Sequence, residues 1–244
     1  MSRGGGFCGS DPAGSLEEQQ ALLSHLFARG IATSGRDPRH VTAPANAAEE
    51  LLVAGASPRR KREFWGGRAC ARDALRAFDR ADQAVLRGKR GEPLWPDGVI
   101  GSISHAEVFC AAVVASSDDY LGVGVDVELD GRVSPEFARR VCSPKELARC
   151  AEFGPVDELA SVVFSAKESA YKLQYPASQT VLYWRDLEVL LHEGAFTVRV
   201  LTNNPPFGSA RMLVGRWARG AGLIVSGIAL KRDESSGVCH KRPF

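Results

Sequence analysis

Asp126 and Glu128 are the residues of this chain whose type and spacing most directly suggest chemistry. They lie two positions apart in the segment 121–128, where apolar residues occupy every odd position. This alternation predicts a β-strand, on which residues two apart point to the same face with roughly 7 Å between their Cα atoms. Two carboxylates at that separation can converge on one hard cation such as Mg²⁺.

A second charged group follows about forty residues later, in a segment that reads as a helix over 157–173. Glu168 and Lys172 are four apart and therefore share one face of that helix. A third carboxylate and a lysine suit a magnesium–phosphate site better than a zinc or thiolate site. We expect Lys172 to neutralise phosphate charge, and the long stem of Lys167 to allow it to reach round to the same ligand. The alternative is a surface Glu168–Lys172 ion pair, which contributes only tenths of a kcal/mol on a helix.

Four motifs together resemble those of the 4′-phosphopantetheinyl transferases, in particular the two-lobed siderophore- and surfactin-synthetase type. The agreement in order and spacing extends from about Arg60 to Lys172, roughly half of the chain. The resemblance implies an enzyme that uses Mg²⁺ to move 4′-phosphopantetheine from coenzyme A to a serine of acyl or peptidyl carrier protein domains, releasing 3′,5′-ADP. The motifs are Gly-Lys-Arg-Gly-Glu-Pro at 88–93, Gly-Ser-Ile-Ser-His at 101–105, Gly-Val-Asp-Val-Glu at 124–128 and Phe-Ser-Ala-Lys-Glu at 164–168 with Lys172.

The resemblance also implies roles for single residues. Asp126, Glu128 and Glu168 would ligate the metal, and Glu168 is the leading candidate for the general base that takes the proton of the carrier serine. Asp126, Glu168 and Lys172 form the expected catalytic set. The expected coenzyme A-binding set consists of Arg60, Arg68, Lys89, Arg90, Ser104, His105, Lys167 and Lys172. The family has one basic position where this loop has both Lys89 and Arg90, and the sequence leaves that choice open.

The order of predicted elements indicates an α+β fold, because helices precede strands twice rather than alternating with them. A capping box at Ser15 predicts a first helix that closes at Gly30, and further helices start at Asn46 and over 58–80; strands follow at 99–103, 108–115 and 121–128. Helices then start at Ser134, Ser143 and 157, and strands follow at 187–191, 195–201, 210–217 and 223–230. The resemblance implies two pseudo-symmetric α+β lobes, with the ligand cleft between them. We expect a disordered N-terminus over 1–14, lobes over 15–118 and 119–231, and a mobile tail over 232–244.

Composition limits the function classes. The chain has 244 residues, 44% of them hydrophobic and 25% charged, which is ordinary for a globular protein. Its net charge of +2 gives no indication of a nucleic-acid partner, whereas the basic residues gathered within 59–72 and at 89–90 indicate an anionic ligand. The six cysteines form no CxxC pair and predict reduced thiols in a cytoplasmic protein. No membrane span or signal peptide is predicted, and the length of about two lobes favours a monomer.

Three alternatives stay open at this point. One is another Mg²⁺-dependent phosphotransferase, although the common nucleotide-binding motifs are absent from the sequence. The second is a coenzyme A-binding protein without transferase activity, and the third is a nucleic-acid binder. For docking an acidic carrier domain, the basic candidates on the helices after Glu128 are Arg139, Arg140, Lys145 and Arg149.

Overall fold

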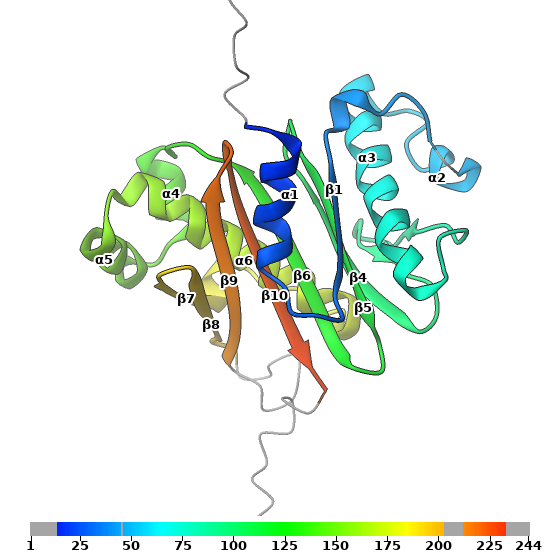
Figure 1. Ribbon diagram of the computed structural model, residues 1–244. Coiled ribbons are helices and arrows are strands. Elements are labelled where there is room, and N and C mark those ends of the chain that lie inside the picture. The colour runs from blue at the N-terminus through cyan, green and yellow to red at the C-terminus, as the bar shows by residue number, and fades with distance from the viewer. Residues whose placement is uncertain (1–13, 45, 203–211, 233–244) are drawn as a thin grey trace, which may run out of the picture.

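The computed structural model describes residues 14–44, 46–202 and 212–232. Helices and two main antiparallel sheets make up the described chain, which confirms the α+β prediction (Figure 1). Each sheet belongs to one lobe. The first sheet is built from the N-terminal half of the chain and the second from the C-terminal half.

The N-terminal sheet has the order β1-β5-β4, from β1 (Ala32–Arg36), β5 (Cys110–Ser116) and β4 (Val99–His105). Helix α3 (Pro58–Leu75) covers one face of it. The helix starts at Ser57, whose hydroxyl accepts a hydrogen bond from the Arg60 amide, and proline in the first turn needs no such partner. The small side chains of α3 and β5 allow close packing in a core that contains Cys70, Ala71, Ala74, Leu75, Cys110, Ala112 and Val114.

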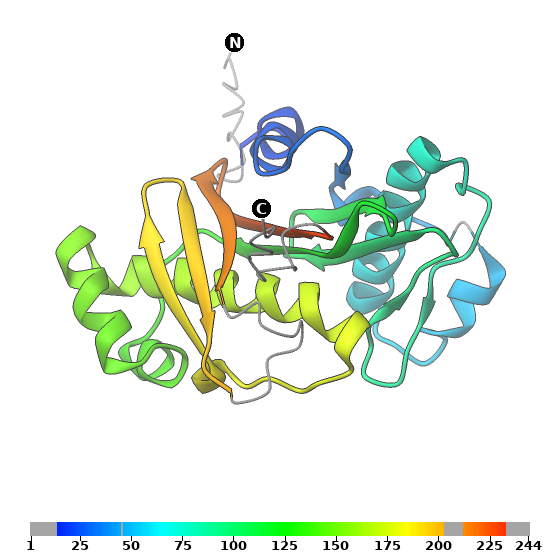
Figure 2. The same ribbon diagram turned by 90° about the horizontal axis from the view of Figure 1, so that it is seen from below.

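The C-terminal sheet has the order β6-β10-β9-β8-β7. Figure 2 shows helix α1 (Leu16–His25) on one side of this sheet and the long helix α6 (Val156–Ser178) on the other. Two separate cores result, one on each face. The strands are β6 (Tyr120–Leu129), β7 (Leu187–His192), β8 (Ala195–Val200), β9 (Met212–Gly220) and β10 (Leu223–Lys231).

The face of β6 that carries the acidic pair is pressed against α6. Gly122 and Gly124 precede Asp126 and Glu128 on that face, since all four lie at even positions. A Cβ atom on Gly124 would lie 1.9 Å from the carbonyl oxygen of Ser169, so only glycine allows the helix to come this close. The glycines therefore bring the turn of α6 between Glu168 and Lys172 onto the strand that carries Asp126.

Two serines of β4 join the lobes at β6. The amide of Val125 donates to Ser102 Oγ at 3.1 Å, and the amide of Val127 donates to Ser104 Oγ at 3.2 Å. These hydroxyls take the place of a backbone ladder between the two sheets. The motif that contains Ser102 and Ser104 thus lies directly beside the motif that contains Asp126.

The remaining elements are short. They are α2 (Ala47–Leu51), α4 (Pro135–Val141), α5 (Pro144–Phe153), the paired strands β2 (Leu86–Arg87) and β3 (Pro93–Leu94), and three single-turn 3₁₀ helices at Pro38–His40, Arg76–Phe78 and Trp184–Asp186. None of the described helices is long and apolar enough to cross a membrane.

Two predictions about local structure were wrong. The first helix ends at His25 rather than at Gly30, and Gly30 instead takes a positive φ of 98° in the turn before β1. Strand β1 was not predicted, because its sequence Ala-Thr-Ser-Gly-Arg has no apolar alternation; it is held by antiparallel pairing with β5. The expected disordered N-terminus and mobile tail lie outside the described residues, except for Gly14 and Arg232.

Candidate active site

A lysine, an aspartate and a serine meet where the two sheets join. Lys172 Nζ lies 2.6 Å from Asp126 Oδ1 and 2.8 Å from Ser104 Oγ. Ser104 Oγ also donates to the same Asp126 oxygen at 3.0 Å. The three residues come from α6, β6 and β4, so the structure brings together three of the predicted motifs at one point.

The negative charge of the carboxylates around this point exceeds the positive charge of the residues that contact them. Asp126 is 2% exposed, and its Oδ2 atom is buried without a hydrogen-bond partner among the described residues. Burial raises the pKa of Glu128 to about 8, and the nearby charges of Asp126 and Glu168 add to the shift. Burial also raises the pKa of Glu168, although a hydrogen bond from Trp184 opposes this. A buried oxygen without a partner, and carboxyl pKa values raised by burial and further by neighbouring carboxylates, fit the binding of a divalent cation.

The carboxylates of Asp126, Glu128 and Glu168 do not form a complete set of metal ligands in this arrangement. Within the part of the chain that the structure describes, no three acidic, histidine or cysteine side chains form a group that could hold a metal. Glu168 is engaged elsewhere, since its Oε1 atom accepts a hydrogen bond of 2.8 Å from Trp184 Nε1. The residue types suit Mg²⁺. To ligate the ion in the present arrangement, Glu168 would have to use Oε2, because Oε1 accepts the hydrogen bond from Trp184.

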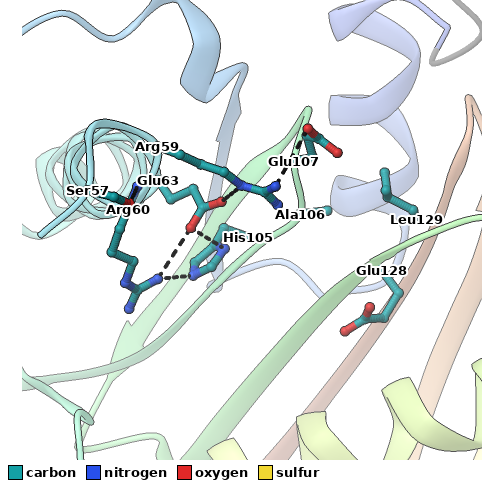
Figure 3. A pocket seen from close by; sticks show the side chains of 9 residues that line it. All are labelled: Ser57, Arg59, Arg60, Glu63, His105, Ala106, Glu107, Glu128 and Leu129. Atoms are coloured by element: carbon teal, nitrogen blue, oxygen red, sulfur yellow. Dashed lines mark hydrogen bonds and ion pairs between the residues drawn. The ribbon is translucent and has the colours of Figure 1, made fainter. Parts of the chain in front are cut away.

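A cavity of about 490 Å³ opens beside Glu128, and its lining includes two arginines, one histidine and three glutamates. Figure 3 shows Arg60 and His105 in contact with each other on one wall of this cavity, with Glu63 beside both. Arg60 Nη1 lies 2.6 Å from His105 Nε2 and 3.6 Å from Glu63 Oε2. Burial lowers the pKa of His105, and the charges of Arg60 and Lys172 lower it further against the pull of Glu63. In the absence of a ligand, the neutral imidazole of His105 therefore accepts a hydrogen bond from Arg60 at Nε2. A phosphate bound beside it would favour protonation of the imidazole.

A second cavity of about 210 Å³ reaches Glu168 and Lys172 from the other side. Arg90 lines it together with Tyr171, whereas Lys89 does not. The ring of Tyr171 stacks on Tyr175 at 5.4 Å between centroids, which gives the cavity a flat aromatic wall. Of the two basic loop residues that the sequence left open, Arg90 is the one that faces the site.

Like Lys89, the predicted coenzyme A-binding residues Arg68 and Lys167 line neither cavity. Arg68 is buried, and its guanidinium donates to the carbonyl oxygens of Val85 and Leu86, which fixes the start of the loop that carries Arg90. Lys167 is 1% exposed and its ammonium points into the C-terminal core. We therefore correct the expectation that Lys167 reaches round to the phosphates: its amine is fully used by acceptors on the far side of α6.

Sequence reasoning missed two residues that contact the site. Glu63 pairs with both Arg60 and His105, whereas the prediction for this helix rested on its basic residues alone. Trp184 donates to Glu168 from a 3₁₀ turn outside every motif. No pattern in the sequence pointed to Trp184, since its contact with Glu168 arises only when the chain folds back onto α6.

Two cavities and a cluster of charged groups meet at this junction, and comparison with known proteins shows the family. Residues 48–115 match the 4′-phosphopantetheinyl transferase N-terminal domain, and residues 122–218 match the 4′-phosphopantetheinyl transferase superfamily. The chain belongs to this superfamily of enzymes. The resemblance seen in the motifs is thus confirmed, and the comparisons support the transferase prediction rather than its alternatives.

Three relatives illustrate the extent of the similarity. The 4′-phosphopantetheinyl transferase Svp of Streptomyces mobaraensis is 38% identical over 217 residues, which cover 86% of this chain and 85% of the relative. The 4′-phosphopantetheinyl transferase PptT of Mycobacterium tuberculosis is 30% identical and covers 75% of this chain and 84% of its own. Enterobactin synthase component D of Escherichia coli (strain K12) is 31% identical, with 61% of this chain and 78% of the relative covered.

Proposed function

We propose that this enzyme transfers 4′-phosphopantetheine from coenzyme A to a serine of acyl or peptidyl carrier domains, with Mg²⁺ at the carboxylate cluster. The observation that carries the proposal is the contact of Lys172 with Ser104 and Asp126. The contact sets the ammonium of Lys172 against the buried carboxylate of Asp126 at the junction of the lobes, beside two cavities that could hold parts of a phosphate-bearing ligand.

The reaction we propose is an in-line displacement at the β-phosphate of coenzyme A. The serine oxygen of the carrier forms a bond to phosphorus, the bond to the 3′,5′-ADP oxygen breaks, and Glu168 takes the serine proton. Lys172 binds the pyrophosphate and offsets the charge that develops on the leaving group. Mg²⁺, held by Asp126, Glu128 and Glu168, would supply further positive charge for the same purpose.

The cavity beside Glu128 supports a role in holding the substrate. Arg60 and His105 already meet there, and both are suited to donating hydrogen bonds to the 3′-phosphate of coenzyme A. Ser104 is held by Asp126 and the Val127 amide, so its hydroxyl is fixed beside the proposed pyrophosphate position. Arg90 would flank the adenine end from the second cavity, and Arg68 acts by holding that loop.

Further parts of the proposal concern the setting of the reaction. We infer a cytoplasmic monomer of two lobes divided near residues 118 and 119, without nucleic-acid or membrane partners. The four described cysteines, which are Cys70, Cys110, Cys142 and Cys150, are buried free thiols, as a reducing compartment would keep them. The first family match ends at residue 115 and the second begins at residue 122, on the two sides of the β5–β6 turn. This division supports the proposed boundary. Light scattering at several concentrations tests the oligomeric state.

Mass spectrometry of a carrier protein tests the reaction. An apo carrier incubated with this enzyme, coenzyme A and Mg²⁺ is expected to gain the mass of one phosphopantetheine group, and excess EDTA is expected to prevent the gain. A gain that persists in EDTA would contradict the metal assignment. The absence of a gain with acyl and peptidyl carriers alike, from folded enzyme, would contradict the proposed reaction.

A further inference from the structure

Trp184 is held from two sides by adjacent residues of α6. The indole Nε1 donates to Glu168 Oε1 at 2.8 Å, while the backbone carbonyl oxygen of Trp184 accepts from Lys167 Nζ at 3.1 Å. Lys167 and Glu168 are neighbours in the sequence and point in different directions from the helix. They nevertheless contact the same residue, one through its backbone and the other through its ring.

The Lys167 anchor is rigid. Its ammonium also donates to Glu146 Oε2 at 2.9 Å and to the carbonyl oxygen of Val141 at 2.8 Å. Glu146 is in turn fixed by the amides of Ser143 and Val189, and both charged side chains are 1% exposed. A buried ion pair whose remaining polar atoms are satisfied is costly to rearrange. The backbone of Trp184 is therefore tied to a fixed point on α6.

The ring of Trp184 is held as firmly as its backbone. It packs against Phe164 at 5.7 Å between centroids, with the planes at 81°, and against Phe137 at 6.3 Å. The two phenylalanines also contact each other edge to face at 5.2 Å. Such edge-to-face contacts restrict the ring to one orientation. The indole N–H consequently stays directed at Glu168.

We infer that Trp184 is the positioning residue for Glu168, and that Lys167 acts through it. This inference rests on the proposed function, in which Glu168 takes the proton of the carrier serine. The terminal torsion of a glutamate side chain is soft, so a single strong hydrogen bond decides which oxygen faces the substrate. Indole is a donor only and leaves Glu168 Oε2, which accepts no hydrogen bond from any described residue, for the serine and the metal.

Replacing tryptophan by phenylalanine tests this role. W184F keeps an aromatic ring against Phe137 and Phe164 but removes the donor. W217F is the matched control, because Trp217 Nε1 donates only to backbone carbonyl oxygens, at 3.0 Å and 3.2 Å, in the β7–β8 hairpin. For W184F we expect kcat to fall about tenfold to a hundredfold, while the KM and the calorimetric Kd for coenzyme A change by less than about twofold. W217F is expected to transfer at the wild-type rate.

The pattern of losses separates positioning from a merely structural role. A kcat of W184F within about twofold of wild type would overturn the inference. So would a fall in kcat accompanied by equal losses of coenzyme A binding and of Tm, since that would show damage to the fold. The wild-type enzyme in the same assay reports separately on the proposed function.

A second measurement tests the hydrogen bond between Trp184 and Glu168 without depending on turnover. The Tm changes of W184F and E168A are expected to be non-additive by a few degrees in the double variant, because either change alone breaks the same hydrogen bond. The pair W217F and E168A is expected to be additive. Additive changes for W184F and E168A would refute the contact even if no carrier is modified by the wild-type enzyme.

Discussion

Replacing Gly124 by alanine is expected to separate the catalytic residues without touching any of them. The new Cβ atom would lie 1.9 Å from the carbonyl oxygen of Ser169 and 2.9 Å from the amide nitrogen of Leu173, where ordinary contact begins at 3.4 Å. Both are backbone atoms of one α6 turn and cannot rotate away. The helix must therefore move back by about 1 Å or more.

This shift acts on the turn between Glu168 and Lys172, so it lengthens the contact of Lys172 with Asp126, now 2.6 Å. We expect a loss of stability of about 1–3 kcal/mol from overpacking, and a fall in kcat of about a hundredfold from misplacement on that scale. Thermal unfolding and single-turnover transfer to an apo carrier measure the two effects.

Gly131 provides the control for this substitution. It lies just beyond β6, and a Cβ atom there meets nothing within 4 Å. Gly131→Ala is therefore expected to keep the wild-type Tm and transfer rate. If Gly124→Ala matched it in both, the close packing of α6 on β6 would not be what positions the site, and the reasoning would be refuted.

Three other substitutions test the charges of the site. Asp126→Ala is expected to lower transfer at least about a hundredfold while circular dichroism stays unchanged, because the variant loses a metal ligand rather than core packing; near-normal transfer would contradict the metal assignment. Glu128 has its pKa raised from 4.5 to about 8, so its contribution to the stability of the metal-free fold is present below pH 4.5 and is lost as pH rises through 8. In EDTA, Glu128→Gln is therefore expected to have a Tm above wild type at pH 8 but not at pH 4.5, and equal Tm values at pH 8 would count against the buried charge. Arg60→Ala is expected to raise the KM for coenzyme A about tenfold and to leave that for dephospho-coenzyme A unchanged, since only the former carries the 3′-phosphate; equal increases would place Arg60 elsewhere.

The strand and the helix that meet at the junction could be predicted from the sequence because their signals are local. The alternation around Asp126 fixes a strand and a face, and the four-residue spacing of Glu168 and Lys172 fixes a helix face. Because the charged residues of the strand and of the helix suit the same ligand, the two faces that carry them were expected to face each other. The capping box at Ser15 and the helix start at Ser143 were also predicted correctly, since each depends only on residues three apart.

Predictions that depended on long-range contacts were less successful. Lys167 was expected to reach the phosphates because lysine suits an anionic ligand and has a long stem, yet its partner Glu146 lies on another helix. Strand β1 gains its structure by pairing with β5, far along the chain. Trp184 reaches Glu168 only through the fold of the segment after α6. In each case the deciding energy comes from tertiary packing, which local propensity does not encode.

A crystal structure of the enzyme with coenzyme A and Mn²⁺ in place of Mg²⁺ tests the central claim most directly. Anomalous scattering locates the metal independently of the protein atoms. We expect the metal between Asp126, Glu128 and Glu168, and the pyrophosphate within hydrogen-bond distance of Lys172. A metal bound elsewhere, or coenzyme A bound away from the junction of β4, β6 and α6, would contradict the account.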